Sequence, residues 1–224
     1  MPTPPANRVI EARQGVEYLQ IGKDSIESFT NFVFNHFVKR IGKRQQWRPS
    51  EADYRTMLSE EQSLATTGFF IAARIPGGRI VGAMRAAQWS PDMRLATEKI
   101  FHIDPAVIAH QRGVPAESVW HVSQMCVDTE FLVAQNYSWR VGIEIMRTIV
   151  KHLFRAVAPH NGRIALLESD DQINAYLNRF LQIETTPLGS TRDYIGQTQV
   201  AIIDLDIHYG LPYIQAKIGS RILR

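Results

Sequence analysis

Polar side chains interrupt one of the most apolar stretches of the chain, residues 119–127. The stretch reads Val-Trp-His-Val-Ser-Gln-Met-Cys-Val. Burying His121, Ser123 and Gln124 costs free energy unless each finds a hydrogen-bond partner, whereas apolar residues need none. A neutral imidazole such as that of His121 is a base available near pH 7. No histidine and acid are placed by the sequence to activate Ser123, which favours a structural role for it. This stretch is where we first expect chemistry.

Arg85, in an earlier apolar run, is the second candidate. An arginine that ends such a run must meet an anion, a carbonyl group or solvent, and its guanidinium can bind a carboxylate through two parallel hydrogen bonds. The alternative is an exposed charge at the end of a strand. Met125 and Cys126 are interpreted as core residues. The other histidines show no ligand spacing with cysteines or acids, so we expect no metal site.

The composition is that of a soluble globular protein. The 224 residues are 45% hydrophobic and 21% charged, and the net charge is +3. Charges of both signs are interspersed, which argues against nucleic-acid binding, and no apolar run is long enough for a membrane span. A single cysteine excludes an intrachain disulfide and favours a cytoplasmic location. We expect one domain over residues 16–206, after a flexible lead of residues 1–15 and before a C-terminal extension of residues 207–224.

The order of expected elements indicates an α/β fold with antiparallel and parallel parts. Periodicity and turn residues predict strands over 16–21, 69–74, 79–87, 119–127, 163–167 and 198–206, and helices over 24–41, 50–58, 138–158 and 169–180, with a short helix after 104–105 and an irregular stretch around it. Ser50 is expected to cap one helix, and Ser169 with Gln172 another. A turn is expected around Gly189 and Gly196. The long helix is a crossover, which makes strands 119–127 and 163–167 parallel neighbours.

This arrangement resembles the GNAT acyltransferase fold, and within it the acyl-homoserine-lactone (autoinducer) synthases and N-acyl amino acid synthases. Residues 78–85 resemble the family strand that ends in arginine, and residues 119–127 resemble the strand with the pattern aromatic, glutamate, any residue, serine, arginine. Further similarities are Phe101 and, in the N-terminal lobe, Trp47, Glu51 and Asp53. The resemblance covers about residues 30–206 and implies a mostly antiparallel sheet with one splayed parallel pair, flanked by helices.

The departures from the family pattern fall on chemically active positions. His121 stands where the synthases carry glutamate, Gln124 where they carry arginine, and Thr56 near a second acidic position. Acyl transfer follows from the resemblance, whereas use of S-adenosylmethionine and lactone formation do not. Residues 121 and 124 point to opposite faces of a regular strand. The resemblance implies a bulge that turns both to one side and frees a backbone N–H for the thioester carbonyl.

The resemblance therefore implies an N-acyltransferase that moves an acyl group, expected to be a fatty acyl group, from acyl-carrier protein or acyl-CoA to the amine of a small amino-acid-like acceptor. We expect no tightly bound cofactor, with acyl-CoA or acyl-phosphopantetheine as the co-substrate. The implied roles are catalytic for His121 and Tyr176, substrate-binding for Trp47, Arg85, Ser123 and Gln124, and cofactor-binding for Met125, Val127, Arg140 and Gly142.

Two other functions remain open at this point. One is a short-chain acetyl-CoA-dependent N-acetyltransferase, and the other is a catalytically silent GNAT-like module that binds a ligand or partner. Each candidate residue also has a structural alternative. His121 can be a core histidine bonded to backbone, Gln124 can bond within the sheet, and Trp47 and Tyr176 can simply pack.

Overall fold

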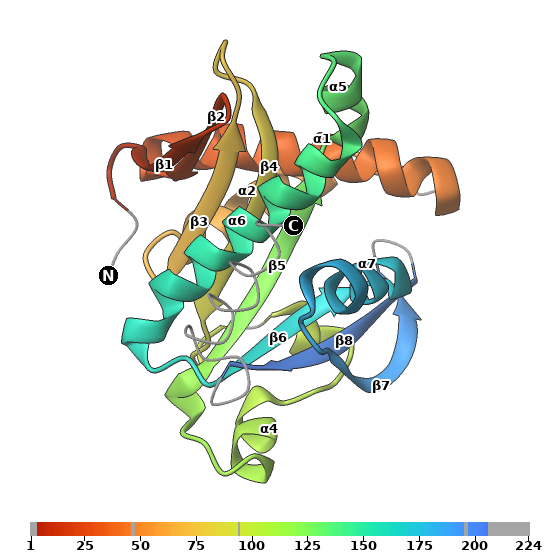
Figure 1. Ribbon diagram of the computed structural model, residues 1–224. Coiled ribbons are helices and arrows are strands. Elements are labelled where there is room, and N and C mark those ends of the chain that lie inside the picture. The colour runs from red at the N-terminus through yellow and green to blue at the C-terminus, as the bar shows by residue number, and fades with distance from the viewer. Residues whose placement is uncertain (1–3, 46–47, 94, 195–196, 206–224) are drawn as a thin grey trace. The chain divides into compact units, whose positions relative to one another are not determined.

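The computed structural model describes residues 4–45, 48–93, 95–194 and 197–205 of the chain (Figure 1). The strands are β1 Arg8–Arg13, β2 Val16–Gln20, β3 Gly68–Arg74, β4 Ile80–Gln88, β5 Val119–Val127, β6 Ile164–Ser169, β7 Thr186–Asp193 and β8 Gln197–Asp204. The α-helices are α1 Ile26–Gln45, α2 Glu51–Leu64, α3 Ala96–Lys99, α4 Pro105–Gln111, α5 Thr129–Ala134, α6 Trp139–Val157 and α7 Asp171–Tyr176. None of the helices in these ranges combines the length and apolarity that a bilayer crossing requires.

The chain forms two compact units. The first comprises Met1–Arg85 and Gln124–Leu153, and the second comprises Ala86–Ser123 and Phe154–Arg224. The strands β4 and β5 and the helix α6 each continue from one unit into the other, and each unit is described by itself. The single domain expected over residues 16–206 stays a prediction.

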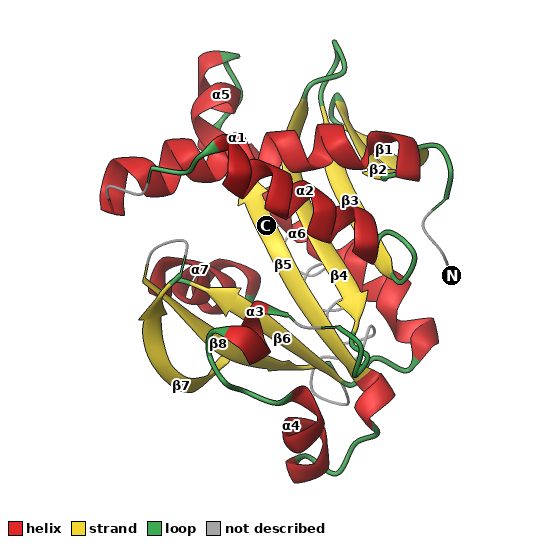
Figure 2. Ribbon diagram, turned by 180° about the vertical axis from the view of Figure 1, so that it is seen from behind, coloured by secondary structure: helices red, strands yellow, loops and turns green. Residues whose placement is uncertain are grey.

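The first unit is an antiparallel sheet with helices on both faces. Strands β1, β2, β3 and β4 follow one another in the sheet, with Tyr18 opposite Ala73 between β2 and β3. The end of β5 lies beside the start of β4, because the Asp128 N–H donates to the Val81 carbonyl oxygen at 2.9 Å. Helix α6 covers one face (Figure 1), and α1 and α2 cover the other (Figure 2).

A glycine lets α6 pack closely on the sheet. A Cβ atom at Gly82 in β4 would lie 2.8 Å from Ile145 Cγ2 and 3.0 Å from Ile149 Cδ1 of the helix. The amphipathic pattern of residues 138–158 predicted this helix, and the buried positions confirm it. The face that contacts the sheet carries Ile145, Ile149 and Leu153, each 0% exposed.

Helix α2 begins with the predicted cap. The Ser50 hydroxyl accepts from the Asp53 N–H at 3.3 Å, and Asp53 Oδ2 accepts from the Ser50 N–H at 2.6 Å, a reciprocal capping box. The helix continues beyond the expected end at Leu58 to Leu64. Its buried residues Met57, Glu61 and Leu64 lie at helical spacing, so an acid belongs to the buried face.

The second unit contains the parallel pair that the crossover helix predicted. β5 pairs with β6 in parallel, His121 opposite Leu166, and β8 and β7 follow in antiparallel order. Within the second unit, the last pair between β5 and β6 is Val122 with Leu167. β6 nevertheless continues to Ser169, which is paired with Gln199 of β8. The parallel pairing thus ends before either strand does.

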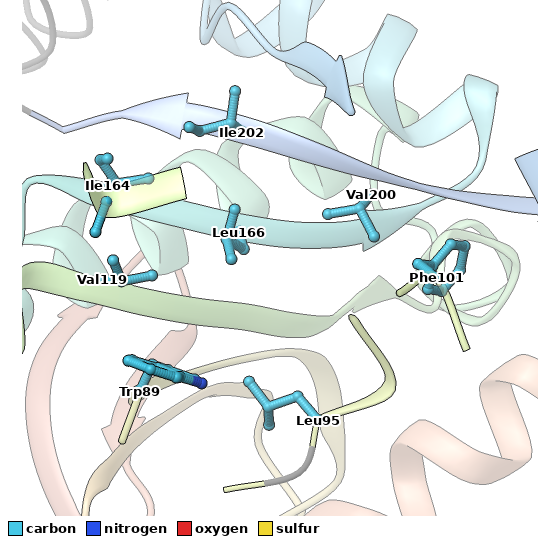
Figure 3. Close-up of a cluster of buried hydrophobic side chains, with 9 residues drawn as sticks. Trp89, Leu95, Phe101, Val119, Ile164, Leu166, Val200 and Ile202 are labelled. Atoms are coloured by element: carbon cyan, nitrogen blue, oxygen red, sulfur yellow. The ribbon is translucent and has the colours of Figure 1, made fainter. Parts of the chain in front are cut away.

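The core of the second unit lies on one face of these strands. It gathers Val119, Ile164, Leu166, Val200 and Ile202 from the sheet with Trp89, Leu95, Phe101 and Ala109 from the preceding segment (Figure 3). Side chains two apart in a strand share a face, so this apolar surface also contains positions 121 and 168.

Two segments that were expected to lack regular structure contain strands, so these predictions were wrong. The N-terminal lead of residues 1–15 contains β1, which pairs antiparallel with β2, Arg8 opposite Gln20. The turn expected around Gly189 lies inside β7, whose pairing with β8 shifts register between Leu188 and Arg192. The stretch around the correctly predicted α4 also contains the short helix α3. Gly196 and residues 207–224 lie outside the described residues.

The cap of α7 was also predicted wrongly. Asp170, not Ser169, is the N-cap, and its side chain accepts from the Ile173 N–H at 2.8 Å. Ser169 instead donates its hydroxyl to Asn174 Oδ1 at 2.9 Å. The helix ends at Tyr176 and is followed by a π-helical turn, Leu177–Leu181.

Candidate functional site

A histidine and a glutamate meet on the polar end of the second unit's apolar face. His121 Nε2 lies 2.7 Å from Glu168 Oε2, and the two side chains are 4% and 9% exposed. A carboxylate can only accept a hydrogen bond, so Nε2 carries the proton and donates. This tautomer makes Nδ1 the basic nitrogen of the ring. The strand register explains the contact, since His121 faces Leu166 and Glu168 follows on the same face.

Thr97, in the first turn of α3, holds the other oxygen of Glu168. Glu168 Oε1 accepts from the Thr97 N–H at 2.7 Å and from the Thr97 hydroxyl at 2.5 Å. Thr97 is fully buried. The three residues form a hydrogen-bonded chain inside the second unit, called the His121 relay below. A carboxylate held by two donors on one side has little freedom to turn away from the imidazole.

The surroundings of the His121 relay are apolar. Val119, Leu166 and Val200 on the same face are each no more than 1% exposed. Hydrogen bonds to a charged group are stronger where water is excluded. A histidine oriented in this way by a carboxylate can act as a general base. The arrangement therefore has the parts needed to remove a proton from a reacting group.

The backbone of β5 departs from regular strand geometry at Gln124. Its φ of 61° lies in the left-handed region, which non-glycine residues seldom adopt. A local irregularity of this kind interrupts the alternation of side chains between the two faces of a strand. It falls at the place where the resemblance implied a bulge.

Three polar residues of the first unit form a second buried group, called the Glu61 cluster below. Glu61 Oε1 accepts from Gln124 Nε2 at 2.8 Å. Glu61 Oε2 lies 2.8 Å from Arg85 Nε, an ion-pair distance, although the N–H does not point straight at the oxygen. The side chains of Arg85 and Glu61 are only 4% and 2% exposed. Arg85 lies inside β4, which continues to Gln88, and not at the end of its strand.

The remaining candidates of β5 are mostly interior. Ser123, Met125 and Cys126 are buried, and Val127 is half-buried. Burial is the main cause that raises the pKa of the Cys126 thiol, so the thiol keeps its proton. This agrees with the interpretation of Cys126 as a core residue.

Arg140 and Gly142 lie in the first turns of α6. Arg140 is exposed, and its guanidinium lies 5.7 Å from the ring centre of Trp139. A Cβ atom at Gly142 would lie 3.2 Å from Thr129 Oγ1, so this glycine allows α5 and α6 to approach closely. The cofactor-binding role expected for these two residues stays a prediction.

Tyr176 and Trp47 complete the expected set. Tyr176 is half-buried at the end of α7, with its ring centre 5.4 Å from that of Phe180. Trp47 lies outside the described residues. The catalytic role of Tyr176 and the binding role of Trp47 stay predictions.

Three residues that the sequence interpretation overlooked complete the two groups. Glu61 lies beyond the expected end of its helix, and Glu168 lies one residue beyond an expected strand. Each was detectable as an acid that continues an apolar pattern. Thr97 gave no such signal, because α3 has only four residues. Within the described ranges, no three histidine, cysteine or acidic side chains gather in a way that could hold a metal ion.

Comparisons with known proteins agree at the level of the fold. No known protein-family model and no curated protein matches the sequence. The fold is similar to that of FeeM, an N-acyl amino acid synthase from uncultured soil microbes (9% identity, 94% of this chain and 92% of that chain, TM-score 0.57). It is also similar to BjaI, a CoA-dependent acyl-homoserine lactone synthase (16%, 88% and 82%, TM-score 0.54), and to a GNAT-family acetyltransferase from Staphylococcus aureus Mu50 (10%, 85% and 99%, TM-score 0.55). These similarities show a GNAT-like fold.

Proposed function

We propose that the chain is an N-acyltransferase that moves a fatty acyl group from acyl-carrier protein or acyl-CoA to the amine of a small amino-acid-like acceptor. The observation that carries the proposal is the His121 relay, a buried base oriented by Glu168 at 2.7 Å. The fold supports it, because the named functions of the similar structures share the transfer of an acyl group.

The reaction needs one base and one site for developing negative charge. His121 Nδ1 takes a proton from the acceptor ammonium, and the neutral nitrogen attacks the thioester carbonyl carbon. The carbonyl oxygen becomes negative and is stabilised by backbone N–H groups of residues 123–125. The tetrahedral intermediate expels the thiolate and loses the second proton from nitrogen. The products are an amide and a thiol, with the thiolate protonated by Tyr176 or by solvent.

The donor is a pantetheine thioester. Met125 and Val127 of β5 and Arg140 and Gly142 of α6 are its proposed binding residues. Arg140 and Gly142 lie in the first turns of α6, where free N–H groups favour a phosphate. Acyl-carrier protein and CoA share this pantetheine arm. No tightly bound cofactor is needed for the reaction.

The test measures thiol release and product mass together. The full-length protein is incubated with dodecanoyl-acyl-carrier protein, dodecanoyl-CoA or acetyl-CoA and a mixture of small primary amines. We expect release of thiol with at least one donor and an N-acyl amine of the matching mass. Loss of the base in His121→Gln should lower the rate by about 10²–10⁴-fold. A preference for acetyl-CoA would identify a short-chain acetyltransferase instead.

The chain offers a matched control in a second histidine–glutamate contact. His152 Nε2 lies 3.0 Å from Glu11 Oε2, and the His152 side chain is 6% exposed. His152→Gln therefore removes a buried histidine paired with a carboxylate, and we expect its transfer rate to match that of the wild type. Retained transfer in His121→Gln, or no thiol release with any donor, would contradict the proposal.

A further inference from the structure

In the Glu61 cluster one positive side chain faces one negative side chain. The positive charge of Arg85 lies beside the negative charge of Glu61, with Nε and Oε2 2.8 Å apart, and both side chains are nearly fully buried. Gln124 adds no charge. A buried arginine is commonly a binding site for an anion, but here the anion is already part of the protein.

This pairing of charges determines which ligand charges are tolerated. A carboxylate brought to Arg85 would lie near the carboxylate of Glu61 in a buried place. Like charges in such a place repel, and the additional buried charge would have no partner of its own. A ligand group without charge avoids both penalties.

The amide of Gln124 faces the cluster in a fixed orientation. Its Nε2 donates to Glu61 Oε1 at 2.8 Å, and a carboxylate cannot act as a donor, so the nitrogen must be on that side. The Gln124 Oε1 atom is buried and has no hydrogen-bond partner in the described part of the chain. A buried acceptor of this kind is stabilised when a donor reaches it.

On the premise of the N-acyltransferase function above, we propose that the Glu61 cluster selects acceptor amines without a free carboxylate. Gln124 Oε1 accepts a hydrogen bond from an N–H or O–H group of the acceptor. The substrate class is then amino alcohols, amino-acid amides and amino lactones, and not free amino acids.

The test uses two reaction products that differ in a single group, N-dodecanoylserine and N-dodecanoylserinamide. Binding of each to the full-length wild type is measured by isothermal titration calorimetry. We expect the amide to bind at least about tenfold more tightly than the acid, because only the acid adds a buried like charge. Glu61→Gln removes the negative charge that lies beside Arg85, so the preference should fall at least about tenfold or reverse.

A control at a more exposed arginine–glutamate pair and a second variant keep the test decisive. Glu17 Oε2 accepts from Arg74 Nη2 at 2.6 Å elsewhere in the first unit, and Glu17→Gln should leave the preference for the amide unchanged. Gln124→Met removes the acceptor oxygen and should weaken binding of the amide more than that of the acid. Circular dichroism of each variant checks that it is folded.

The outcomes separate this proposal from the proposed function. Equal binding of acid and amide by the wild type, tighter binding of the acid, or no binding of either would overturn the selection by the Glu61 cluster. An unchanged preference in folded Glu61→Gln would overturn it as well. Discrimination between the two products without transfer from any donor would contradict the proposed function and leave the selection standing.

Discussion

Glu168 and Thr97 are joined by two hydrogen bonds that end on one oxygen. The Thr97 N–H and hydroxyl both donate to Glu168 Oε1, at 2.7 and 2.5 Å, while the second oxygen of the carboxylate meets His121. The helix turn that carries Thr97 therefore fixes the rotation of the carboxylate. Thr97 is a positioning residue in the proposed reaction, acting on the base through Glu168.

The first prediction removes one of these two bonds. Thr97→Val keeps the backbone N–H and the shape of the side chain but loses the hydroxyl. We expect a loss of about 1 kcal/mol in the free energy of unfolding and a fall of about tenfold in kcat, because Glu168 can then turn away from His121. Thr97→Ser should restore kcat. A kcat equal to that of the wild type in folded Thr97→Val would contradict the positioning role.

The second prediction concerns His36 in α1. Burial, and then the positive charge of Arg40, lower the pKa of His36 from 6.5 to about 4, although Asp128 acts in the other direction. As the pH falls from 6.5 to about 4, the unfolded chain binds a proton that the folded chain does not. The contribution of His36 to the free energy of unfolding should therefore decrease over this interval and level off below it.

His36→Gln tests this directly, because glutamine does not titrate. Urea unfolding of both proteins at about pH 7, 5.5 and 4.5 should give a smaller decrease for the variant. Other groups titrate equally in both proteins, so the difference between the two curves measures His36. Parallel curves would contradict the prediction.

The third prediction concerns the ion pair between β1 and α6. Partial burial raises the pKa of Glu11. The hydrogen bond and charge of Lys151, together with His152, lower this pKa by more than burial raises it, so it lies below its ordinary value of 4.5. A lowered carboxylate pKa stabilises the fold above 4.5, and the stabilisation is lost as the pH falls through the folded-state pKa.

Glu11→Gln should therefore be less stable than the wild type at neutral pH. The gap should close in acid, when Glu11 is protonated in both the folded and unfolded wild type. Partial exposure of Glu11 keeps the effect small. Thermal melts over the pH range measure it, and a gap that widens toward low pH would show that the sign is wrong.

The fourth prediction concerns Gly82, where α6 lies directly on the sheet. The Cβ atom in Gly82→Ala would lie 2.8 Å from Ile145 Cγ2 and 3.0 Å from Ile149 Cδ1, closer than van der Waals contact. We expect a loss of about 1–3 kcal/mol in the free energy of unfolding, because the helix must move. Gly77→Ala serves as a contrast. An added Cβ there meets no atom within 4 Å, so any loss of stability comes from the positive φ of the backbone and not from a steric clash. Equal stability of Gly82→Ala and the wild type would contradict the packing argument.

Long amphipathic elements and their caps could be predicted from the sequence. The period of α6, the Ser50 cap, the hairpin between β3 and β4, and the parallel pair of β5 and β6 all follow from local pattern or from the length of a crossover. β7 could not be predicted, because it is largely exposed and contains Pro187 and Gly189. Only its pairing with β8 makes it a strand.

The candidate site was predicted in part, for a physical reason. His121, Arg85 and Gln124 were visible as polar residues in apolar runs. Their partners were not, because Glu168 is brought to His121 by strand register and Glu61 is brought to Arg85 by helix packing. The spacing of residues along one strand gives no information about either of these contacts. The same partners change the expected chemistry, since Arg85 meets a carboxylate of the protein itself.

The left-handed backbone at Gln124 limits which residues can replace it. At a φ of 61°, β-branched side chains are strongly disfavoured, whereas glycine, asparagine or a long unbranched residue fits. A related protein that changes its preferred acceptor amine by substitution at position 124 is therefore restricted to these residue types. Conformation as well as chemistry would then determine the routes by which specificity diverges.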